Sequence, residues 1–95
     1  MKVFIICSVR GASAEYKAKL EKYVSELEDK GIIVHLPHRD TNQKESGFNI
    51  CKQNVCVIRE YDEVHVFYNG NSQGAHFDMG AAFALGKKIK VVENE

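Results

Sequence analysis

The sequence predicts one α/β domain of three layers, in which helices cover both faces of a four-stranded parallel sheet. Segments rich in β-branched and aromatic residues alternate with segments whose apolar residues recur every three or four positions. The resulting order is β-α-β-α-β-α-β, which is typical of a parallel sheet wrapped by helices. The length of 95 residues allows a single domain (1–95) with a small core.

The first half of the chain is expected to hold two strands and a long helix. Residues 3–7 form a continuous apolar run, which indicates a strand buried on both faces. A helix is expected over residues 14–30, because its apolar residues share one face, and Gly31 is placed to end it. Residues 32–35 form the second strand, which Pro37 ends.

The second half repeats the pattern. Residues 38–47 are expected to form a polar loop, and residues 48–60 a helix with a weaker apolar face. A third strand is expected at 63–68 and a third helix at 73–85. The last strand, 88–92, alternates lysine with apolar residues, which suits the edge of a sheet.

Right-handed crossovers favour the strand order 2-1-3-4, as in Rossmann-like and flavodoxin-like proteins. Such proteins bind ligands beyond the carboxyl ends of the strands, at the point where the order reverses. Here that point lies between the first and third strands. The loops that follow them, residues 8–13 and 69–74, are also the segments richest in glycine and serine. We therefore expect a ligand site between these two loops.

Composition excludes several classes of function. The 13 basic and 13 acidic residues give a net charge of zero, which argues against binding of a nucleic acid polymer. No apolar run approaches the roughly 20 residues that span a bilayer, and the start does not resemble a signal peptide. The three cysteines have neither disulfide nor zinc spacing. We expect a cytoplasmic protein that uses no membrane and no metal.

Residues 8–13 carry groups suited to an anion. Arg10 offers a forked cationic donor, Ser8 and Ser13 offer hydroxyls, and the start of a helix offers free backbone N–H groups. The alternative is that Ser13 only caps the helix and that Arg10 is solvated. Neither a Walker loop nor a G-x-G-x-x-G pattern is present.

The helix expected at 73–85 carries a single acid, Asp78, in a segment that is otherwise almost without charge. A helix that is apolar on nearly all sides is expected to be buried on nearly all sides. Stabilisation of the helix dipole is the default explanation for such an acid. Because the helix is expected to be buried, the alternative is that Asp78 is a functional carboxylate. Ser72 could cap this helix or offer its hydroxyl to an anion.

Several segments share the order and spacing of one family. Residues 4–12 contain Cys-Ser-Val-Arg-Gly, and residues 72–80 read Ser-Gln-Gly-Ala-His-Phe-Asp-Met-Gly. The chain resembles the nucleoside 2-deoxyribosyltransferase superfamily, with a closer similarity to its 2′-deoxynucleoside 5′-monophosphate N-glycosidase branch. The first segment is similar to the phosphate loop of that branch, and the second to the family pattern Ser/Asp-x-Gly-x-x-x-Glu-x-Gly. Residues 34–40 and 81–92 also look like the matching parts of the family.

The resemblance implies an enzyme that cleaves the N-glycosidic bond of a 2′-deoxynucleoside 5′-monophosphate, by hydrolysis or by transfer to a second base. Asp78 is implied as the nucleophile at C1′, where an adjacent anion also stabilises an oxocarbenium-like transition state. The small-molecule deoxynucleotide is the expected partner, and no cofactor is implied. The implied substrate-binding residues, most of them around the phosphate, are Ser8, Arg10, Gly11, Ser72 and Gly74.

Two positions depart from the family pattern. Asp78 stands where the family has Glu, and Asn54 stands where it has an acid that protonates the leaving base. Asn54 is still expected to contact sugar or base. These departures leave open a non-catalytic nucleotide-binding or sensing module, or an interaction domain. The chain ends soon after its last strand, where members usually continue, so we expect a pocket that is open or completed in a homodimer or higher homo-oligomer.

Overall fold

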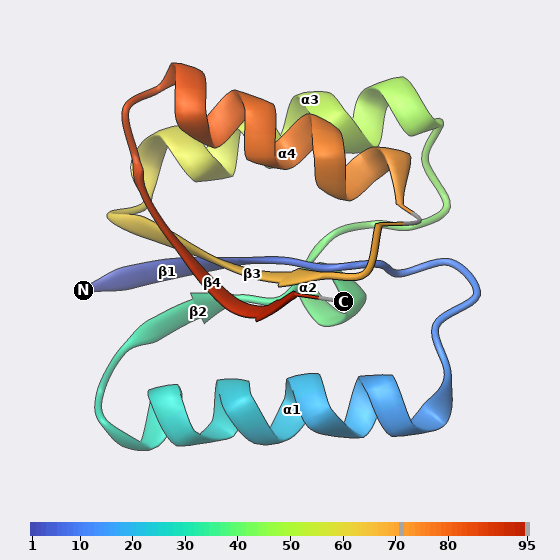
Figure 1. Ribbon diagram of the computed structural model, residues 1–95. Coiled ribbons are helices and arrows are strands. Elements are labelled where there is room, and N and C mark those ends of the chain that lie inside the picture. Colours follow the sequence, from blue (N-terminus) through green and yellow to red (C-terminus); the bar gives the residue numbers. More distant parts are fainter. Residues whose placement is uncertain (71, 95) are drawn as a thin grey trace.

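The computed structural model describes residues 1–70 and 72–94, and it has the expected three layers (Figure 1). The central sheet is parallel throughout, with the strand order β2-β1-β3-β4. This confirms the predicted fold class. The strands are β1 (Lys2–Ile6), β2 (Ile33–His35), β3 (Glu63–Tyr68) and β4 (Lys88–Asn94).

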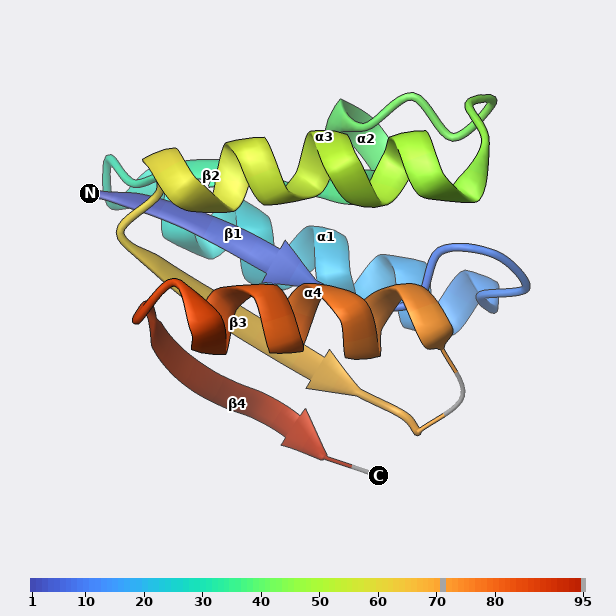
Figure 2. The ribbon, with the colours of Figure 1, turned by 90° about the horizontal axis from the view of Figure 1, so that it is seen from above.

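Helices cover both faces of the sheet unequally. Helix α1 (Ala14–Asp29) lies alone on one face, and α3 (Gly47–Glu60) and α4 (Gln73–Ala84) lie on the other (Figures 1 and 2). Seen from above, α3 and α4 run side by side in the same direction, so their N-termini lie at the same end of the molecule. The carboxyl end of β1 lies at that end too.

The core has two halves because side chains alternate along β1. Val3 and Ile5 pack towards α1, whereas Phe4 and Ile6 pack towards α3 and α4. All four side chains are fully buried, as the continuous apolar run predicted. Strand β4 pairs only with β3 and forms an edge of the sheet, also as expected.

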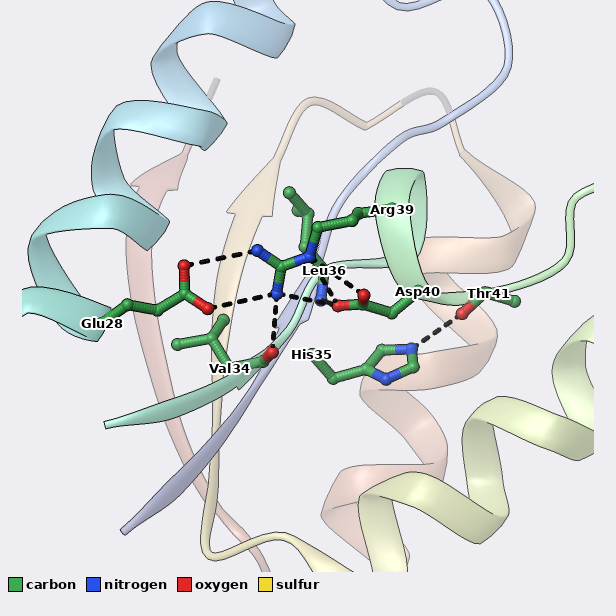
Figure 3. A network of polar contacts seen from close by, with 7 residues as sticks. All are labelled: Glu28, Val34, His35, Leu36, Arg39, Asp40 and Thr41. Atoms are coloured by element: carbon green, nitrogen blue, oxygen red, sulfur yellow. Dashed lines mark hydrogen bonds and ion pairs between the residues drawn. The ribbon is translucent and has the colours of Figure 1, made fainter. Parts of the chain in front are cut away.

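A short helix, α2 (Pro37–Asp40), corrects the expectation of an entirely polar loop after β2. Pro37 opens this helix, where the fixed φ of proline fits and its missing N–H costs nothing. The Asp40 carboxylate accepts a 2.9 Å bond from the backbone N–H of Leu36. Arg39 then pairs with both Asp40 and Glu28, which ties α2 to α1 (Figure 3). These side-chain contacts, rather than any apolar periodicity, hold the turn.

The expectation that α4 is buried on nearly all sides was wrong. Its buried residues are Ala75, Asp78 and Ala82, whereas Phe77 is 48% exposed and Phe83 is 80% exposed. Small residues let the helix lie against the sheet and α3, and Met79 packs against the core, whereas Phe77 and Phe83 are exposed. A homodimer through this face stays a prediction. Within the described residues, no helix has the length and apolarity needed to cross a membrane.

Candidate active site

Asp78 is a buried carboxylate in the N-terminal half of α4. Asp78 is only 5% exposed to solvent. Oδ2 accepts a 3.2 Å hydrogen bond from Nδ2 of Asn54, which lies on α3. Oδ1 is buried and has no hydrogen-bond partner among the described residues. A buried carboxylate oxygen without a partner is costly, and such groups are rare in native structures.

Burial also changes the protonation of this site. Loss of solvation raises the pKa of Asp78 to about 7, and the hydrogen bond from Asn54 opposes that rise. Burial, together with the nearby charge of Asp78, raises the pKa of the Cys7 thiol to about 12. The same two causes raise the pKa of Cys51. Near neutral pH, Asp78 is therefore poised between its two forms, while these thiols are protonated.

Asp78 lies on the wall of a pocket of about 680 Å³. Helix α3 contributes Gly47, Ile50, Cys51 and Asn54 to this wall. Their spacing of three and four residues places them on one face of the helix. Helix α4 faces them, and the segments after β1 and β2 supply further lining residues. The pocket therefore lies at the carboxyl end of the parallel sheet, where the strand order was expected to create a site.

The start of α4 supplies groups suited to an anion. Ser72 caps the helix, since its Oγ accepts a 3.1 Å bond from the backbone N–H of Ala75. The N–H groups of Gln73 and Gly74 precede the first bonds inside the helix. Arg10, an exposed cation on the loop after β1, lines the same pocket. This end of the pocket thus combines a helix N-terminus, a hydroxyl and a guanidinium.

Ser8 and Gly11, two further residues of the implied phosphate site, do not line the pocket. Ser8 is buried, and its backbone N–H donates a 3.3 Å bond to the hydroxyl of Tyr16. Its carbonyl oxygen accepts a 2.8 Å bond from Nε2 of His38. Gly11 has φ +72°, a conformation that suits glycine at a turn. Both residues shape the loop that carries Arg10, and direct contact with phosphate stays a prediction.

The structure brings in Thr41, which the sequence did not single out as a site residue. Thr41 is buried, and its hydroxyl donates a 3.1 Å bond to Oδ1 of Asn54. Gln43, from the same segment, lines the pocket, and its amide group donates a 3.0 Å bond to the carbonyl of Pro37. The sequence carries no periodicity in this loop, so only its polar composition could have drawn attention to it. Within the described residues, no group of His, Cys, Asp and Glu is arranged to hold a metal ion.

The fold and the pocket together define an α/β protein with a pocket at the switch point of a parallel sheet. Comparison with known proteins narrows this class. The chain matches no protein-family model and no curated protein sequence. It does match solved structures, among them an N-glycosidase and a deoxyribosyltransferase.

One of these is the CMP N-glycosidase BcmB of Clostridium botulinum, which is 31% identical with a TM-score of 0.69. The match covers 94% of this chain and 66% of that protein, just under two thirds of its length. The other is a 2-deoxyribosyltransferase from Bacillus psychrosaccharolyticus, 18% identical with a TM-score of 0.75, matched over 94% and 69% of the two chains. These neighbours confirm the resemblance to the nucleoside 2-deoxyribosyltransferase superfamily, with an N-glycosidase among its members.

Proposed function

We propose that this protein cleaves the N-glycosidic bond of a 2′-deoxynucleoside 5′-monophosphate, with Asp78 as the nucleophile. The observation that carries the proposal is the buried Oδ1 of Asp78, which has no hydrogen-bond partner among the described residues and lies in a pocket at the carboxyl end of the sheet. The two structural neighbours, one named an N-glycosidase and one a deoxyribosyltransferase, support the class of reaction. A carboxylate oxygen that bonds to no protein group keeps its lone pairs for the substrate.

The reaction begins when Oδ1 of ionised Asp78 attacks C1′ of the sugar. The bond from C1′ to the base nitrogen breaks, and its electron pair leaves with the base. The Asn54 amide is too weak an acid to protonate the leaving base, so the base takes its proton from water. The product is an ester between Asp78 and C1′. Water then attacks C1′ and releases the sugar phosphate, or a second base attacks C1′ and completes a transfer.

The start of α4 favours a phosphorylated substrate. Gly74 and Asp78 are four residues apart, which is about 6 Å along a helix. A 5′-phosphate held at the helix start by Arg10 and Ser72 would therefore leave the sugar beside Asp78. The positive end of the helix dipole adds to the attraction. A neutral protein can bind an anion in this way because Arg10 and the N-terminus of α4 lie at the same end of the pocket.

A non-catalytic nucleotide-binding module is the second candidate. The hydrogen bond between Asn54 and Asp78 favours it, because an amide occupies the position where the family has an acid. Aspartate is also one methylene shorter than the family's glutamate, and misplacement by about 1 Å can cost about 100-fold in rate. In this case the pocket would bind a nucleotide and leave it intact.

Base release measured by chromatography tests both candidates. The substrates are the four 2′-deoxynucleoside 5′-monophosphates, the matching nucleosides, and CMP. We expect free base from a deoxynucleoside monophosphate with the wild type and none with Asp78→Asn, which keeps the side-chain shape. Release that persists in Asp78→Asn would sink the mechanism. Thermal stabilisation by monophosphates without any base release would favour the binding module.

A further inference from the structure

A buried chain of hydrogen bonds leads from β2 to Asp78. Nε2 of His35, at the end of β2, lies 2.8 Å from Oγ1 of Thr41 (Figure 3). Thr41 donates a 3.1 Å bond to Oδ1 of Asn54, and Asn54 donates a 3.2 Å bond to Oδ2 of Asp78. All four residues are buried. The chain joins three separate parts of the fold: the exit of β2 with its following turn, helix α3 and helix α4.

When Asp78 is ionised, the direction of every bond in this chain is fixed, because a carboxylate can only accept hydrogen bonds. Thr41 has a single hydroxyl proton, and it gives that proton to Asn54. Its oxygen must therefore accept from His35, so Nε2 of His35 carries a proton. With its oxygen held by Thr41, the amide of Asn54 can only turn its NH₂ group towards Asp78. While Asp78 is ionised and can only accept, reversal of the amide would break both of its bonds at once.

Packing holds the imidazole of His35 at the start of the chain. The ring stacks on Phe4 with a centroid distance of 4.9 Å and an angle of 7°. Tyr61 meets the same ring edge-on at 6.2 Å. Burial lowers the pKa of His35, opposed by Asp40 and aided by Arg39, which favours the neutral ring. A neutral imidazole packed against two aromatic rings is a donor with one fixed direction.

We propose that His35 and Thr41 are positioning residues that fix the Asn54 amide, so that Asp78 is held by Oδ2 and presents Oδ1 to the substrate. Neither His35 nor Thr41 lines the pocket, so both act through Asn54 rather than by touching the substrate. The consequence for catalysis rests on the proposed function. The arrangement of the hydrogen bonds from His35 to Asp78 does not rest on that function, because it involves only groups of the protein.

Two variants of Thr41 form a matched pair for the test. Thr41→Val keeps the shape of the side chain and removes the hydroxyl, whereas Thr41→Ser keeps the hydroxyl. We expect Thr41→Val to lower kcat for base release by up to about 100-fold, as a misplaced nucleophile would, with little change in KM. Thr41→Ser is expected to keep most of the wild-type kcat. Equal losses of kcat in both variants would mean a merely structural role and would overturn the proposal.

Nuclear magnetic resonance supplies a readout that needs no activity. Above pH 7, where Asp78 is ionised, the ¹⁵N shifts of wild-type His35 are expected to show the proton on Nε2. The side-chain NH₂ of Asn54 is expected to exchange slowly with water. Thr41→Val should speed that exchange, and Thr41→Ser should not. A proton on Nδ1 of wild-type His35, or fast exchange at Asn54, would overturn the proposal even if Thr41→Val did not fold. A wild type that releases no base would refute the proposed function. These spectra would still decide whether the hydrogen bonds from His35 to Asp78 form as described.

Discussion

Removal of the charge of Asp78 is predicted to stabilise the protein above neutral pH while it abolishes base release. Asp78→Asn keeps the side-chain shape and leaves the Asn54 amide an oxygen to bond. In the unfolded chain, an aspartate has a pKa of about 3.9. In the folded protein, burial raises the pKa of Asp78 to about 7. The folded state therefore resists ionisation that the unfolded state accepts.

The sign and size of the effect follow from proton linkage. Between about pH 4 and pH 7 the folded wild type holds a proton that the unfolded chain has lost, so its stability falls as the pH rises. Each pH unit in this range is worth about 1.4 kcal/mol, which sums to about 4 kcal/mol. Asp78→Asn has no such proton. Its advantage over the wild type should be absent near pH 4, grow through this range and level off above about pH 7.

Urea denaturation of both proteins from pH 4 to pH 9 measures this difference. The expected gain is a large fraction of the roughly 5–15 kcal/mol that holds a small domain together. Asp29→Asn, the same chemical change at an exposed residue at the end of α1, is the matched control. The free energy of unfolding of Asp29→Asn should follow that of the wild type at every pH. If Asp78→Asn also ran parallel to the wild type, the carboxylate would not be buried as described, and the reasoning would fail.

Three further predictions concern the phosphate end, the acid position and the loop after β1. Arg10→Gln should weaken binding of a 5′-monophosphate by about 10- to 100-fold, as loss of a charged hydrogen bond would; calorimetry that showed an equal loss for the nucleoside would contradict this. Asn54→Asp should increase base release near pH 6, because two adjacent carboxyl groups share a proton and one can donate it to the base. An unchanged pH–rate profile would count against that role. Tyr16→Phe should lower the free energy of unfolding by about 1–3 kcal/mol, because the hydroxyl bridges the backbone beyond β1 and the backbone of β3; an unaltered urea midpoint would argue that this bridge is unimportant.

Local pattern was enough to predict the order of the elements and the strand topology. The strand at 63–68 matches β3 exactly in its bounds, and the helices begin within one residue of their expected positions. Hydrophobic periodicity carries this information because each strand or helix shows the core one face at its own repeat. The four-residue helix α2 has no room for a periodic pattern. Its stability comes from side-chain contacts such as Arg39 with Glu28, which only the folded chain brings together.

The candidate site was predictable in part, for the same reason. Asp78 stood out as a single acid in an apolar helix, and Arg10 and Ser72 stood out beside turn signals. Thr41 did not, since nothing in a polar loop distinguishes the one hydroxyl that becomes buried. Ser8 shows the opposite outcome: it belongs to the loop that the sequence indicated, but it lies outside the pocket wall.

By itself, the sequence determined the α/β fold, the family resemblance and the presence of a carboxylate near the switch point, because these depend on residue type and spacing along the chain. Only the tertiary structure decided how that carboxylate is held. It placed Asn54 against Oδ2, left Oδ1 without a partner among the described residues, and linked Asn54 through Thr41 to His35. The physical reason is that burial and hydrogen bonding join residues from separate elements, and neither leaves a mark on local periodicity.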